Sequence, residues 1–145
     1  MLGEPGRIRW RLHLSAFPST VYQLLATPQG RRRFWAEDAP ERDGVIRFRF
    51  ANGETLEAPV LERREDERFA LRYFDGRVVQ FELEVHERGG TDLTFTEEDV
   101  PDEVREEQLA GWAAVLLALK VAADFRVDLR NHDAARTWDQ GYVDG

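Results

Sequence analysis

The feature that most constrains this fold is a change of hydrophobic period along the chain. Between about residues 43 and 98 apolar residues alternate with polar ones, whereas from Pro101 to about Val127 they recur at intervals of three and four. The first pattern is typical of strands with one buried face, and the second of an amphipathic helix. We therefore expect an antiparallel sheet followed by a helix of about 27 residues that packs on one face of it.

Residues 43–98 predict several strands joined by short turns. Phe48 and Phe50 alternate with arginines, and residues 79–85 alternate most regularly of all. Short connections between sequential strands imply antiparallel hairpins. Pro59 interrupts one pattern and predicts an edge strand or a bulge. Turn signals separate the strands at Asn52-Gly53, Asp75-Gly76 and Gly89-Gly90.

The segment before this stretch predicts a strand and two helices. Residues 7–14 alternate strictly, as a half-buried strand does. Thr27 is a good N-cap and Pro28 suits a first helical position, so a second short helix should follow the first and carry Phe34 and Trp35 at its end. The expected class is α+β: a curved antiparallel β-sheet of about six strands, wrapped around a long C-terminal helix, with two short helices after the first strand.

Composition limits the possible partners. A net charge of −8 argues against binding to nucleic acid or to an anionic membrane, because both need a basic surface. The chain has no cysteine, which excludes thiolate chemistry and fits a cytoplasmic location. We expect neither a leader sequence nor an apolar stretch long enough to span a bilayer. The length suits one domain, residues 1–130, followed by a polar C-terminal tail, residues 131–145.

Three segments resemble a known family. Residues 16–30 with Phe34-Trp35 resemble its early helix pair, residues 90–95 its final strand, and Gly111-Trp112 with Leu116, Leu119 and Lys120 the start of its long helix. In this order they resemble the helix-grip fold of the START-like (SRPBCC) superfamily. The nearest likeness, over about residues 7–130, is to the domain related to the activator of heat-shock protein 90 ATPase. The tail lies outside the resemblance.

The resemblance implies a cavity between the sheet and the long helix. Each aromatic residue that would line it also fits a filled core, Lys120 can reach solvent along its stem, and Tyr73 can bond to a backbone group. Trp35 and Trp112 are the strongest candidates, since they lie near element ends where a mouth can open. The candidate ligand-binding residues are Phe34, Trp35, Phe48, Phe50, Tyr73, Phe81, Trp112, Leu116 and Lys120.

The leading functional hypothesis is non-enzymatic binding of a small lipophilic molecule, without a cofactor. The resemblance also implies two alternatives: a chaperone-associated interaction domain, or a cyclase or dehydratase of aromatic polyketides. No catalytic constellation or metal-binding spacing is visible, and the three histidines are not expected to gather. Glu97-Glu98 is interpreted as charge near a helix start rather than as an acid/base couple.

Overall fold

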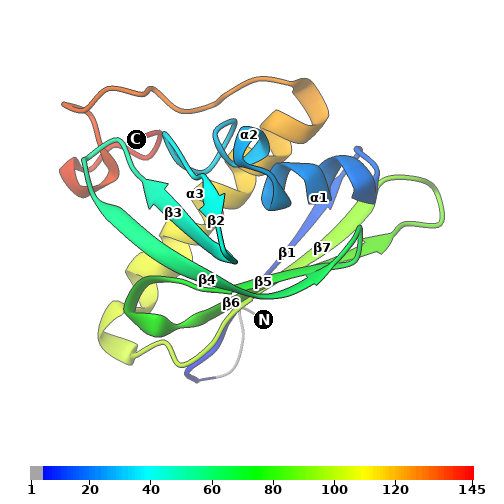
Figure 1. Cartoon of the computed structure of the whole chain (residues 1–145), viewed down its shortest axis with the longest axis horizontal. Coiled ribbons are helices and arrows are strands. Elements are labelled where there is room, and N and C mark those ends of the chain that lie inside the picture. Colours follow the sequence, from blue (N-terminus) through cyan, green and yellow to red (C-terminus); the bar gives the residue numbers. More distant parts are fainter. Residues whose placement is uncertain (1–4) are drawn as a thin grey trace.

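One sheet of seven antiparallel strands forms the β layer of the molecule, and the helices lie on one side of it (Figure 1). The computed structural model describes residues 5–145. The expected α+β helix-grip class is confirmed, with one strand more than expected because β2, at two residues, is too short to leave a pattern. In their order across the sheet the strands are β1 (Ile8–Leu14), β7 (Thr91–Glu97), β6 (Val78–Val85), β5 (Arg68–Arg72), β4 (Thr55–Arg64), β3 (Val45–Arg49) and β2 (Glu41–Arg42).

The long helix, α3, spans Arg105–Phe125. It has 21 residues, so the expected length of about 27 residues is wrong. A short 3₁₀ turn, η2 (Asp102–Val104), precedes it. The helix ends because Arg126 adopts a left-handed conformation with φ of 57°, which stops the regular hydrogen-bond pattern.

One face of α3 packs on the inner face of the sheet. Trp112, Leu116 and Leu119 are all buried there, and the ring centroids of Phe95 on β7 and Trp112 are 4.3 Å apart. By length and composition alone, the stretch Asp102–Phe125 is also sufficient for a membrane span, contrary to our expectation. In this fold its apolar face meets the sheet.

Two short helices, α1 (Pro18–Ala26) and α2 (Pro28–Arg31), form a V after β1. Thr27 caps α2 as predicted, since its side-chain oxygen accepts a hydrogen bond from the Gly30 amide at 3.0 Å. The two helices meet so closely that a Cβ atom on Gly30 would lie 2.3 Å from the Gln23 carbonyl oxygen. Glycine is therefore required at this junction.

Arg31 is fully buried and fixes the turn that follows α2. Its guanidinium donates to the carbonyls of Ala39, at 2.7 Å, and Leu25, at 3.1 Å. Burial lowers the pKa of Arg31 to about 10, so the side chain stays charged at neutral pH. We expected Phe34 and Trp35 at the end of the second helix. Because α2 ends at Arg31, they lie instead in the turn that follows it.

Pro59 lies in β4, an interior strand, so the edge-strand alternative is wrong. A register shift between Val60 and Glu62 follows it directly, in agreement with the predicted bulge.

Residues 126–145, called here the C-terminal strap, run back over the helical side of the molecule (Figure 1). They end in a 3₁₀ turn, η3 (Trp138–Gln140), closed by reciprocal hydrogen bonds between Thr137 and Gln140. Trp138 lies beside Gly111 of α3, where a Cβ atom would be 3.8 Å from the indole. Asn52, in the β3–β4 turn, donates to Asp139 at 3.3 Å. The strap therefore joins the start of α3 to the β3–β4 turn.

Candidate ligand-binding cavity

Three aromatic side chains from separate elements meet beneath the strap: Trp35 after α2, Tyr73 after β5 and Trp112 on α3. The Trp35 indole nitrogen donates to the Tyr73 hydroxyl at 3.0 Å. Ring centroids are 5.1 Å apart for Tyr73 and Trp112, and 6.2 Å apart for Trp35 and Trp112. We call these three rings the cavity floor. Burial raises the pKa of Tyr73, so its hydroxyl is protonated at neutral pH.

A cavity of about 360 Å³ opens above this floor. One wall comes from α3, through Gly111, Val115 and Ala118; the β3–β4 turn and the strap contribute others. The lining is mainly apolar, and its aromatic side chains are Phe34, Trp35, Phe50, Tyr73, Phe74, Trp112 and Trp138.

Five of the nine residues predicted from sequence line this cavity. They are Phe34, Trp35, Phe50, Tyr73 and Trp112.

The other four lie elsewhere. Phe48, Phe81 and Leu116 are buried in the core between sheet and helix. The Lys120 ammonium donates to the carbonyl of His13 on β1 and to Asp124, outside the cavity lining. Lys120 therefore links α3 to β1 in this structure.

The floor rests on a buried carboxylate. Glu97, at the end of β7, accepts hydrogen bonds from the Trp112 indole at 3.0 Å and from Arg77 at 3.2 Å. Its side chain is 0% exposed, and burial raises its pKa although the bonds from Arg77 and Trp112 act in the opposite direction. The interpretation of Glu97 as a helix-start charge is wrong. Leu93, Phe95 and Glu97 share one strand face, and that parity was the available signal.

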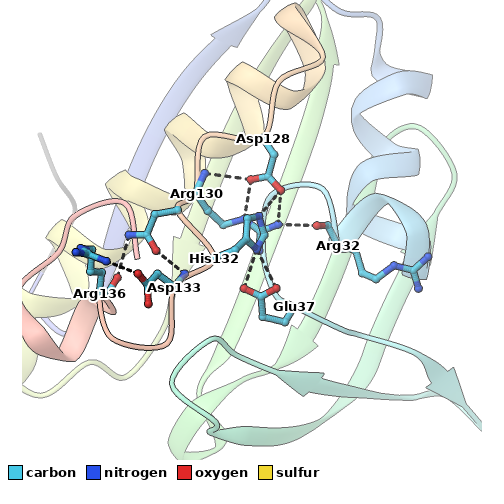
Figure 2. Close-up of polar contacts among 8 residues, drawn as sticks. Arg32, Glu37, Asp128, Arg130, His132, Asp133 and Arg136 are labelled. Atoms are coloured by element: carbon cyan, nitrogen blue, oxygen red, sulfur yellow. Dashed lines mark hydrogen bonds and ion pairs between the residues drawn. The ribbon is translucent and has the colours of Figure 1, made fainter.

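The strap is joined to the loop after α2 by the ion pair between His132 and Glu37 and by the hydrogen bond from Arg130 to the Arg32 carbonyl (Figure 2). His132 places Nδ1 2.8 Å from Glu37 and Nε2 2.7 Å from Asp128. Arg130 pairs with Asp128 at 2.9 Å and donates to the Arg32 carbonyl. Burial alone lowers the pKa of His132, but the hydrogen bonds to Asp128 and Glu37 outweigh it and raise the pKa overall. An imidazole with a carboxylate at each nitrogen favours the protonated form.

The strap's contribution to the cavity was not predicted. Leu129, Thr137, Trp138 and Val143 all border it. An isolated tryptophan in a polar tail was the one available signal, because large aromatic side chains usually find a surface to cover.

Within residues 5–145, no group of three or more His, Asp or Glu side chains is placed to hold a metal ion. Two of the histidines do gather, contrary to our expectation: the rings of His13 and His86 are 5.3 Å apart, and His13 pairs with Asp92. This pair lies on the outer side of the sheet, away from the cavity lining.

Comparison with solved structures supports the fold. The Aha1 dimer from Colwellia psychrerythraea matches at 25% identity and a TM-score of 0.73, over 81% of this chain and 96% of that one. The protein SSP2350 from Staphylococcus saprophyticus matches at 23% identity and a TM-score of 0.75, over 86% and 96%. The protein CV1439 from Chromobacterium violaceum matches at 26% identity and a TM-score of 0.67, over 83% and 99%.

A search of curated protein sequences finds no match. A family model does match, over residues 15–124, which include every floor residue but leave out the strap. The early helix pair, the sheet from β2 to β7 and nearly all of α3 lie within the match. The chain therefore belongs to the family of Activator of Hsp90 ATPase homolog 1-like proteins.

Proposed function

We propose that this protein binds a small, largely apolar molecule in the cavity between α3, the β3–β4 turn and the strap, without catalysing a reaction on it. The observation that carries the proposal is a cavity of about 360 Å³ bordered by seven aromatic side chains. Binding sites for small molecules are typically concave, mainly apolar and about 300–1,000 Å³ in volume. A core that was simply filled would leave no such space.

One polar group inside the apolar lining is suited to orient a ligand. The Tyr73 hydroxyl accepts a hydrogen bond from Trp35, and its own proton meets no acceptor among residues 5–145. A hydroxyl is both donor and acceptor. The proton of Tyr73 is therefore available to an oxygen or nitrogen atom of the guest.

The two titratable groups at the floor, Glu97 and Tyr73, favour binding over turnover. A cyclase or dehydratase needs an acid or base that can exchange a proton with the substrate. Glu97 is engaged by Arg77 and Trp112 beneath the floor, and the raised pKa of Tyr73 makes its hydroxyl a poor base and a poor acid at neutral pH.

Titration with the neutral fluorescent probe N-phenyl-1-naphthylamine tests the proposal. Ala118 borders the cavity on α3, so Ala118→Leu fills part of it; Ala110, exposed on the same helix, supplies the control Ala110→Leu. We expect saturable binding that weakens at least about tenfold in Ala118→Leu and is unchanged in Ala110→Leu. Absence of saturable binding, or equal binding by both variants, contradicts the proposal.

A second candidate is an interaction with a heat-shock protein 90 chaperone. The observation that favours it is the family match over residues 15–124. Mixing the protein with a bacterial homologue of that chaperone and measuring ATP hydrolysis tests it. A rate that rises with added protein supports this role, and an unchanged rate together with failure of the chaperone to co-purify removes it.

A further inference from the structure

The charged side chains that border the cavity are predominantly acidic. Glu37, Glu54, Glu107, Asp139 and Asp144 lie in its lining, against Arg130 and His132. The excess is therefore negative even when His132 is protonated, and the net charge of the chain, −8, has the same sign.

Both basic groups already have carboxylate partners. Arg130 pairs with Asp128 at 2.9 Å, and His132 is held between Asp128 and Glu37. An anionic guest would have to compete with these carboxylates for either group. The cavity is therefore poorly suited to a fatty acid or a phosphate ester.

The other four acidic groups keep their charge uncompensated. Among residues 5–145, Glu54, Glu107, Asp139 and Asp144 form no ion pair. Their hydrogen bonds come from neutral donors: Asn52 donates to Glu54 at 3.1 Å, and Asn131 donates to Asp144 at 3.0 Å. A neutral donor orients a carboxylate without cancelling its charge.

The aromatic lining supplies a second, independent attraction for a cation. The centroids of Tyr73 and Phe74 are 5.0 Å apart, and those of Phe50 and Phe74 are 5.7 Å apart, so the rings continue from the floor toward the β3–β4 turn. Aromatic faces attract cations, ammonium groups above all, through their quadrupole. Glu54 lies at this same turn, so ring faces and negative charge meet at one end of the cavity.

We infer that the guest of this cavity is a lipophilic cation, an apolar and preferably aromatic body that carries one substituted ammonium group. The inference rests on the proposed function and specifies the ligand class for that site. The apolar body lies over the floor formed by Trp35, Tyr73 and Trp112. The ammonium group lies toward the rim, between the rings of the β3–β4 end and the acidic side chains.

A pair of ligands of equal shape tests the inference. Benzyltrimethylammonium and neopentylbenzene differ only in that nitrogen with a positive charge replaces a carbon atom. We expect the cation to bind about tenfold more tightly, the range of a partly desolvated cation–π contact. The preference should decrease between about 0.01 M and 0.15 M salt, as the screening length falls from about 30 Å to about 8 Å.

Three outcomes are distinguishable. If neither compound binds, the proposed function and the inference both fail. If both bind with equal affinity, or neopentylbenzene binds more tightly, the cavity is a receptor for neutral molecules and the inference alone is overturned. If benzyltrimethylammonium binds more tightly than neopentylbenzene and this preference decreases as salt is added, the result supports the inference.

Charge-removing variants place the bound cation. Glu54→Gln and Glu107→Gln should each reduce the preference for the cation two- to threefold while the affinity for neopentylbenzene is kept. Glu84→Gln removes the same charge at an exposed position outside the cavity lining and serves as the control. If all three variants behave alike, the cation is bound by the general field of the protein and the inference is wrong.

Discussion

The floor and the strap border the same cavity, and both depend on carboxylates, but they differ in burial. Glu97 beneath the floor is 0% exposed and Arg77 9%, whereas the side chains of His132 and Glu37, which join the strap to the loop after α2, are 37% and 24% exposed. A buried ion pair cannot lose one partner without a large penalty, while an exposed pair contributes little. The comparison predicts a fixed floor and a strap that opens at smaller cost, as entry of the proposed guest would require.

The largest expected effect comes from breaking the ion pair beneath the floor. Arg77→Met leaves the Glu97 carboxylate buried and without its cation, so we expect the free energy of unfolding to fall by about 3 kcal/mol. Urea denaturation measures the loss. The double variant Arg77→Met/Glu97→Gln removes the stranded charge and should recover most of it. A single variant as stable as the parent would show that Glu97 tolerates isolation and that the floor is not fixed in this way.

The same variant should be sensitive to pH. Burial already raises the pKa of Glu97, and loss of Arg77 raises it further. The folded state then holds a proton at a pH where the unfolded state has released it, so stability falls as pH increases through the folded-state pKa. The loss in Arg77→Met is therefore expected to be larger at pH 8 than at pH 5, and an equal loss at both would contradict this.

The same substitution, tryptophan to phenylalanine, should have different costs in the floor and in the strap. Trp112→Phe keeps a ring in the floor but removes the donor to Glu97, which should cost about 2 kcal/mol. Trp138→Phe in the strap, where the indole nitrogen has no hydrogen-bond partner among residues 5–145, should cost less than about 0.5 kcal/mol. Thermal unfolding of both variants measures the difference. Equal losses would remove the distinction between floor and strap.

Gly111 lies in the cavity wall under Trp138, so a large side chain added there should displace the strap and leave the three floor rings unchanged. A Cβ atom there meets only the Trp138 ring, at 3.8 Å, so Gly111→Ala should fit and stabilise α3 by about 0.5–1 kcal/mol. Gly111→Leu is too large for the space under Trp138 and should displace the strap. We expect N-phenyl-1-naphthylamine to dissociate several-fold faster from the leucine variant than from the alanine variant, measured by stopped-flow fluorescence.

The smallest expected effect concerns His132. Its pKa is raised in the folded protein, since the hydrogen bonds to Asp128 and Glu37 outweigh burial. Protonated His132 therefore stabilises the strap, and this stabilisation is fully present below the pKa of histidine in the unfolded chain, about 6.5. It is lost as pH rises through the higher pKa of His132 in the folded protein. Amide exchange in residues 126–145 should therefore accelerate between pH 6 and pH 8.5, after correction for the intrinsic rate. In His132→Gln this additional acceleration should be absent.

The sequence predicts what depends on local periodicity. The strands from β3 to β7 and the buried face of α3 follow from alternation and from spacings of three and four. The cavity, and with it the choice of Trp35 and Trp112 as lining residues, followed from the family resemblance and not from any local pattern. Arg31 could not be predicted as buried, because the carbonyls that accept its hydrogen bonds come together only when α1, α2 and the loop before β2 are packed.

Two features of the site were missed for different physical reasons. The burial of Glu97 could have been predicted from the alternation of residues along β7. An acidic residue near Pro101 also fits the start of a helix, however, and the local pattern does not separate these two interpretations. Docking of Trp138 has no periodic signal at all. It depends on the missing side chain at Gly111, 27 residues earlier, which leaves a place for the indole.

The strap lies beyond residue 124, where the family match stops, yet its side chains complete the cavity. Shape and charge at the rim are therefore encoded partly outside the domain that holds the fold together. Under the proposed function, substitutions in this segment should alter which molecules bind while the sheet and α3 stay intact. Ligand specificity of the proposed site would then be set partly by the last twenty or so residues, independently of the residues that form the fold.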